Sequence, residues 1–492
     1  MPAGPPPTVP PQAPGGPGVP GAAGVPGAPV EPAAAARRPA WAEATDRLRA
    51  AATTEPGRLR LIGAVLAVLV IAFGAVTAWQ ESDRSAAADS VLHRSQPLSA
   101  DAASIYRSLA DANTAAASGF LTGGQEPADL RERYQDDMDR AAEKLANAAA
   151  NSKGSTTSAA QIAKLNRLLP EYAERIQTAR DNNRQGLPLG GAYLRNANDL
   201  MQNEMLPAAE ELYDAEKARL DSDYADAKSY PWVAIFLGLV ALGALVWAQR
   251  RNYRRTNRVL NHGLATATAA TTVVLLWLSV GHTLAWSALS DSYDNGIRSL
   301  NVLNDARIST LRARSDENLT LVARGAETVT KEGKDKGKDA YDVSFIKLMK
   351  SLDGGRGDRL EGSLDKALAL GDDEGDAPVK AAMDAVEAWQ KRHTAAREAD
   401  TQGDYETALA RVIGGKDSKG KLIEKKDATG ECFDVADKAL DQALALEKQD
   451  FLSAAEDGRG AMTGLPIGAA VLAVLAAAGA VLGIGRRLSE YR

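Results

Sequence analysis

Residues 61–79 read LIGAVLAVLVIAFGAVTAW, a continuous block that contains no Asp, Glu, Lys or Arg. A helix needs about 20 mostly apolar residues to cross the roughly 30 Å hydrocarbon core of a membrane. Residues 232–247, 269–289 and 465–484 are three further blocks of this kind. The block at 232–247 is shorter, but tryptophans at both of its edges are typical of the membrane interface. Four such blocks predict four transmembrane helices rather than the buried helices of a soluble protein.

Basic residues predict the orientation of these helices, because Lys and Arg are enriched on the cytoplasmic side. Arginines cluster before the first block, between the second and third, and after the fourth. They are Arg37, Arg38, Arg47, Arg49, Arg58 and Arg60, then Arg250, Arg251, Arg254, Arg255 and Arg258, and finally Arg486, Arg487 and Arg492. We therefore expect both termini in the cytoplasm and two long segments outside the membrane. The first block begins about sixty residues into the chain and lacks a small-residue cleavage site, which indicates an uncleaved signal anchor.

These observations divide the chain into nine predicted segments. Residues 1–40 are almost entirely Pro, Gly, Ala and Val, a composition that cannot bury enough apolar surface to fold. The segments are a disordered cytoplasmic tail (1–57), transmembrane helices at 58–79, 231–249, 265–289 and 464–485, extracytoplasmic bundles at 80–230 and 290–463, a basic cytoplasmic link (250–264) and a cytoplasmic C-terminus (486–492).

The sequence of each outer segment predicts four helices. In the first we expect helices at 81–121, 128–150 and 158–183, and a fourth that runs from residue 192 straight into the second span. In the second we expect a helix from the third span to about residue 330, a broken helix at 340–370, a third at 378–402, a looser excursion at 403–430 and a last helix at 431–462. The predicted fold class is therefore all-α, with four transmembrane helices and two tandem extracytoplasmic antiparallel four-helix bundles.

A shift of 217 positions brings residues of the first bundle onto similar residues of the second. The matches are Tyr172 with Trp389, Arg175 with Arg392, Ala179 with Ala396, Arg180 with Arg397, Gln185 with Gln402 and Gly186 with Gly403. Asn113 and Asn318 also lie at nearly equal distances beyond their spans. Together with the shared plan, these matches predict an internal duplication.

Residue patterns typical of catalysis are missing. The four histidines form no metal-binding pair, and no phosphate-binding glycine loop or nucleophile motif occurs. Cys432 is the single cysteine, so no internal disulfide forms. We therefore predict a protein that is not an enzyme and uses no cofactor or metal. The acidic outer segments argue against nucleic-acid binding.

Two features lie inside the spans. His282 is the one ionisable side chain within them, and its place near the outer interface favours an interfacial histidine over a transport residue. Gly479 and Gly483 form a GxxxG pair, which is either a close-packing face or a chance pair in an Ala-rich helix.

The four spans, tandem outer bundles and disordered inner tail resemble the GlnX-type membrane proteins of actinobacteria. That resemblance covers the chain from about Arg58 onward. It implies a signal relay between an extracytoplasmic solute-binding lipoprotein, which binds glutamate or aspartate, and the cytoplasmic serine/threonine kinase PknG. Each bundle is also similar to the ectodomains of bacterial chemoreceptors. Only about a dozen residues separate the second and third spans, however, so no chemoreceptor output module fits there.

The exposed ends of the bundles are the expected places for a partner or ligand to bind. The candidates are Arg180, Gln185, Gly186, Arg397, Gln402 and Gly403. An arginine can grip a carboxylate with two hydrogen bonds, although an ordinary surface ion pair is the competing interpretation. The predicted function is a transmembrane sensor or signalling adaptor that contacts membrane lipid, with the oligomeric state left open. The alternative is an accessory or scaffold subunit of an amino-acid transporter or envelope complex without signalling.

Overall fold

The computed structural model describes residues 55–123, 126–151, 155–256, 261–354, 362–371, 373–462 and 464–488. The predicted disordered tail lies outside these residues up to position 54. The described part of the chain is almost entirely helical, which confirms the all-α fold class. Its only strands are the two-residue β1 (Gly415–Lys416) and β2 (Leu422–Ile423), which pair antiparallel.

Four helices are long and apolar enough to cross a membrane, as predicted. The segments that supply them are α2 (Glu55–Ser90), α8 (Trp232–Thr256), α9 (His262–Asp291) and α16 (Leu465–Leu488). Large apolar side chains such as Val68, Phe236 and Val474 stay exposed on them, where lipid would cover them. The chain therefore has the helices of a multi-pass membrane protein, while its sidedness stays a prediction.

The GxxxG pair of α16 is a close-packing face. A Cβ added to Gly263 of α9 would lie 2.4 Å from the carbonyl oxygen of Gly479 and 2.5 Å from Cα of Gly483. The Asn261 amide nitrogen also donates to the Gly483 carbonyl oxygen at 2.8 Å. Only glycine permits this close backbone approach, so the small residues hold α9 and α16 together.

The first bundle has the predicted four helices. They are α3 (Gln96–Leu121), α4 (Ala128–Asn151), α5 (Thr156–Arg184) and a returning helix made of α6 (Leu189–Leu200), the π-helical η2 (Met201–Met205) and α7 (Leu206–Lys228). The prediction that this returning helix runs unbroken into its span was wrong. It stops at Lys228, because Ser229 adopts extended rather than helical backbone and Pro231, two residues later, has no amide hydrogen to continue the helix.

The second bundle departs further from its prediction. It contains α10 (Arg298–Ala323), α11 (Ala340–Asp353), α12 (Ser363–Leu370), α13 (Asp373–Thr401), α14 (Tyr405–Ile413) and α15 (Thr429–Met462). Helix α10 ends seven residues before the predicted residue 330, because Arg324 and Gly325 adopt positive φ angles of 48° and 78°. The region at 403–430 is not loose, since it holds α14, the β1–β2 pair and the 3-10 turn η4 (Lys425–Asp427).

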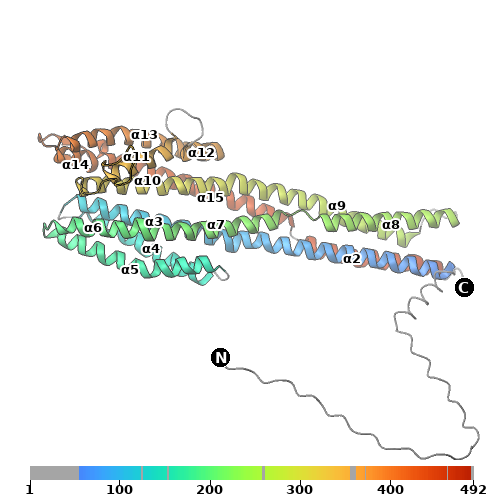
Figure 1. Ribbon diagram of the computed structural model, residues 1–492. Coiled ribbons are helices and arrows are strands. Elements are labelled where there is room, and N and C mark those ends of the chain that lie inside the picture. The colour runs from blue at the N-terminus through green and yellow to red at the C-terminus, as the bar shows by residue number, and fades with distance from the viewer. Residues whose placement is uncertain are drawn as a thin grey trace, which may run out of the picture. The chain divides into compact units, whose positions relative to one another are not determined.

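The two bundles are fused along α3 and α10, which lie side by side in Figure 1. Nearly all of α3 is buried, and one hydrophobic core spans both bundles. Polar bonds cross the seam: Asn113 donates to the Ser315 hydroxyl at 2.8 Å, and Asn318 donates to the Ser118 hydroxyl at 2.7 Å. The sequence predicted two bundles in tandem, and the structure shows that they share a core.

Helices α5 and α13 have equivalent places in their bundles. Each has 29 residues, and their first and last residues differ by the predicted 217 positions. The buried Tyr172 of α5 donates to the Asn113 side chain at 3.1 Å, and the buried Trp389 of α13 donates to Glu317 at 3.1 Å. These parallels fit a duplication, which stays a prediction.

Candidate functional site

The predicted arginines at the bundle ends are already held by carboxylates. Arg180 donates twice to one Glu126 oxygen, at 2.9 and 3.1 Å, and its guanidinium lies 4.1 Å from the Tyr134 ring centre. Arg397 forms ion pairs with Asp342, at 3.2 Å, and with Asp400. Their side chains are only 16% and 19% exposed. The expectation that both arginines are exposed was therefore wrong, because each folds back onto an acid of its own bundle.

The four other predicted site residues end the helices α5 and α13. Gly186 and Gly403 have φ angles of 69° and 79°, which suit glycine at a helix end. In both turns the next amide bonds back five residues, from Leu187 to Asn182 and from Asp404 to Ala399, each at 2.9 Å. Gln185 and Gln402 are exposed beside them. These residues shape the two ends, and their role in partner binding stays a prediction.

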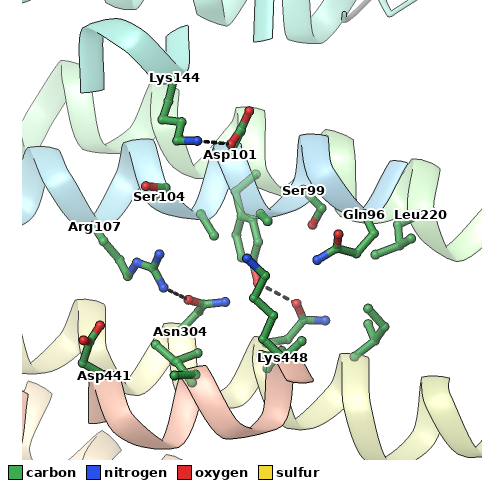
Figure 2. Close-up of a pocket in the computed structure, with 18 residues that line it drawn as sticks. Gln96, Ser99, Asp101, Ser104, Arg107, Lys144, Leu220, Asn304, Asp441 and Lys448 are labelled. Carbon is green, nitrogen blue, oxygen red and sulfur yellow. Dashed lines mark hydrogen bonds and ion pairs between the residues drawn. The ribbon is translucent and has the colours of Figure 1, made fainter. Parts of the chain in front are cut away.

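A cavity of about 340 Å³ lies between the two bundles. Figure 2 shows this cavity, which we call the inter-bundle pocket. Its lining comes from α3, α4 and α7 of the first bundle and from η3 (Ser292–Ile297), α10 and α15 of the second. Cavities of this size accept small ligands.

Arg107 of α3 is the central polar residue of the pocket. Its guanidinium donates to the Asn304 side-chain oxygen at 2.5 Å, and none of the described residues forms an ion pair with it. Burial lowers the pKa of Arg107 to about 10, and the nearby charge of Arg307 acts in the same direction. The carboxylates of Asp441 and Asp437 oppose this lowering, so the side chain stays cationic at neutral pH, although no carboxylate among the described residues is bonded to it.

Other polar groups also line the pocket. Lys144 pairs with Asp101 at 2.9 Å (Figure 2), and the Tyr213 hydroxyl donates to Asn301 at 2.7 Å. Lys448 is exposed and forms no ion pair with any described residue. Asp441 also lines the pocket, and Arg307 pairs with it. Three cationic and two anionic side chains thus line the pocket, an excess of one positive charge.

The pocket adjoins the helices that lead to the membrane. Leu220 and Ile297 line it and also belong to a separate apolar cluster, which we call the stalk cluster. The stalk cluster consists of Ala88, Val91, Leu92, Leu220, Tyr224, Ala227, Ala285, Leu289, Ile297, Phe451 and Ala455. It joins segments at, or just beyond, the outer ends of all four predicted spans. A change in the pocket therefore has a packed route toward every span.

Both outward-running helices contain a π-helical segment beside the pocket. These are η1 (Val91–Ser95), immediately before α3, and η3, immediately before α10. Two lining residues of the pocket adjoin these segments: Gln96 is the first residue after η1, and Ile297 is the last residue of η3. Such π segments carry one extra residue in a turn and are frequent at functional sites. They give these helices a local irregularity at the level of the pocket.

A second polar cluster lies in the core of the second bundle. The Glu317 carboxylate accepts hydrogen bonds from Arg314 at 2.6 Å, His393 at 2.9 Å, Thr429 at 3.0 Å and Trp389 at 3.1 Å. Burial alone would lower the pKa of His393, but hydrogen bonds to Asp342 and Glu317 outweigh it and raise this pKa above its usual value. Burial would raise the pKa of Glu317, yet its bonded cations lower it. The cluster therefore favours the protonated, charged form of His393 between two carboxylates.

Reasoning from the sequence missed the inter-bundle pocket. The usable signal was Arg107 itself, a lone cation in the mostly apolar stretch at 102–121. The other lining residues of the pocket come from α4, α7, η3, α10 and α15 as well as α3, and the fusion of the bundles that brings them together has no sequence motif. Among the described residues, no group of three or more His, Cys, Asp or Glu side chains is placed to hold a metal ion.

Comparison with known proteins supports one functional class. Residues 87–225 match the family model of the actinobacterial sensor domain. The matched region runs from the end of α2 to α7, so it covers the first bundle and includes Arg107, Lys144 and Tyr213. Neither curated proteins nor solved structures gave a match to this chain. The match supports a general sensing role for a chain with four membrane-length helices.

Proposed function

We propose that this protein is a non-enzymatic transmembrane sensor, in which the state of the fused outer bundles is relayed through four stalk helices to the cytoplasm. The observation that carries the proposal is the contact of the inter-bundle pocket with the stalk cluster, through Leu220 and Ile297. The sensor-domain match to the same bundle supports it independently.

A relay needs two arrangements of similar free energy that an outside event weights differently. The stalk cluster offers the contacts that such a change would alter. Tyr224 bonds to the Ser292 hydroxyl at 2.9 Å and packs edge-on against Tyr293, with ring centres 5.2 Å apart. Tyr293 in turn donates to Asp221 at 3.0 Å. These contacts tie α7 to η3, so a shift between the bundles moves helices of both halves.

The proposed input is the availability of glutamate or aspartate, delivered by an extracytoplasmic solute-binding lipoprotein. The proposed output is a cytoplasmic serine/threonine kinase, as the likeness to GlnX-type proteins implies. The exposed ends of α5 and α13, at Gln185–Gly186 and Gln402–Gly403, are the proposed docking places. Changing Gln185 and Gln402 to Ala together should weaken lipoprotein binding and leave the fold intact.

The experiment separates relay from binding. Tyr224→Ala in the stalk cluster should leave lipoprotein binding within about two-fold and abolish the change in kinase-substrate phosphorylation when glutamate is added to cells. Ser222→Ala, on an exposed position of the same helix, is the matched control and should respond like the wild type. A Tyr224→Ala protein that is folded and signals normally would refute the relay through this cluster.

The second candidate function is an accessory or scaffold subunit of an amino-acid transporter or envelope complex. The exposed apolar faces of the four spans favour it, because they offer surface for another membrane protein. In that case, deleting the chain would lower amino-acid uptake without altering kinase output.

A further inference from the structure

We propose that the inter-bundle pocket binds a small dicarboxylate directly, with one carboxylate on Arg107 and the second facing Lys448. This inference deepens the proposed sensing function, because it places a ligand on the chain itself. It does not require the lipoprotein or the kinase, and it is tested on the purified protein.

Among the described residues, no carboxylate forms an ion pair with the guanidinium of Arg107. Other arginines of the two bundles form ion pairs. Arg133 pairs with Asp111, Arg307 with Asp437 and Arg314 with Glu317. Arg107 is largely buried and donates to the neutral Asn304 side chain at 2.5 Å, while the nearby carboxylates of Asp437 and Asp441 are both bonded to Arg307. A buried cation without an anion is costly, and such groups are normally paired. The guanidinium fork matches a carboxylate with two parallel hydrogen bonds, which makes a carboxylate the fitting occupant.

The cavity beside Arg107 has room for a ligand, and its lining carries a second cation. The space of about 340 Å³ beside Arg107 accepts a ligand of several heavy atoms rather than a single ion. Lys144 is neutralised by Asp101, and Asp441 is held by Arg307. The remaining unpaired charge of the lining is that of Lys448, on the exposed side of α15. Two separate cations favour a ligand with two acid groups over a monocarboxylate.

The two cations of the pocket lie on different bundles. Arg107 comes from the first bundle and Lys448 from the second. A ligand that contacts both would bridge the bundles directly above the stalk cluster. Its binding would therefore favour one relative placement of α3 and α15.

The test measures binding to the full chain in lipid nanodiscs by thermal shift and calorimetry, with succinate, propionate and inorganic phosphate as probes. Succinate should bind saturably and more tightly than either of the other probes. Arg107→Gln should weaken succinate binding by about ten-fold or more, since it removes a charge-assisted bidentate contact. Lys448→Ala should reduce the preference for succinate over propionate severalfold. Because Lys448 is exposed, this substitution should leave the fold intact.

Arg167→Gln, an exposed arginine on α5, is the matched control and should bind succinate like the wild type. Absence of saturable succinate binding, or equal binding by Arg107→Gln, would overturn the proposal. Equal affinity for phosphate would overturn the dicarboxylate assignment. Saturable succinate binding together with normal glutamate signalling by a folded Tyr224→Ala protein would leave this site standing and refute the proposed relay instead.

Discussion

Replacing Glu317 by Gln tests the polar core of the second bundle. The carboxylate is fully buried and accepts four hydrogen bonds, two of them from the cationic side chains of Arg314 and His393. Gln keeps the shape but removes the negative charge, so the Arg314 side chain, only 6% exposed, loses its carboxylate. Breaking a buried ion pair in this way costs about 3–5 kcal/mol of unfolding free energy.

This loss is measurable as a shift in melting temperature. At roughly 1–2 °C for each kcal/mol in a cooperative unit of this size, Glu317→Gln should melt about 3–10 °C below the wild type in the same detergent. Glu398→Gln, at an exposed position of α13, is the control and should change stability by about 0.5 kcal/mol at most. A Glu317→Gln protein that melts within about 2 °C of the wild type would show that the carboxylate does not hold this core together.

Three further predictions follow from other parts of the structure. Because the pKa of His393 is raised from 6.5, its contribution to stability is fully present below that value and is lost as pH rises through the folded-state pKa. The stability difference between the wild type and His393→Phe should therefore shrink as the pH rises above about 6.5, and a constant difference would contradict the raised pKa of His393. Gly263→Val should disrupt the α9–α16 contact, because its Cβ would lie 2.4 Å from the Gly479 carbonyl oxygen. The melting temperature of the full chain should fall, and an unchanged melting temperature would disprove the close contact. A cysteine at Ser418 should react with an impermeant thiol reagent on intact wall-stripped cells and one at Arg254 should not, and labelling at Arg254 would reverse the orientation.

The sequence was most informative where one physical rule dominates. Hydrophobic length located the four membrane helices, and glycine-containing turns such as Gly186 and Gly403 located the ends of α5 and α13. It was less informative where tertiary contacts decide. The early end of α10 depends on a left-handed Arg324, a residue type that does not signal a helix end.

The candidate site was harder to predict than the fold. Arg180 and Arg397 were expected to be exposed, but Glu126, in the loop before α4, and Asp342, on α11, come close to them only after folding. Arg107 was overlooked because its environment is created by the fusion of the bundles along α3 and α10. The periodicity of apolar residues shows on which face of a helix a residue lies. It does not show which other helix packs against that face.

The central claim is that an event at the outer bundles moves the cytoplasmic ends of the spans. The direct measurement is the distance distribution between spin labels at Arg60 on α2 and Arg250 on α8, in nanodiscs, with and without the glutamate-loaded lipoprotein. The account predicts a shifted distribution when the complex forms, and no shift in Tyr224→Ala. Identical distributions in the wild type, with complex formation verified in the same sample, would contradict it.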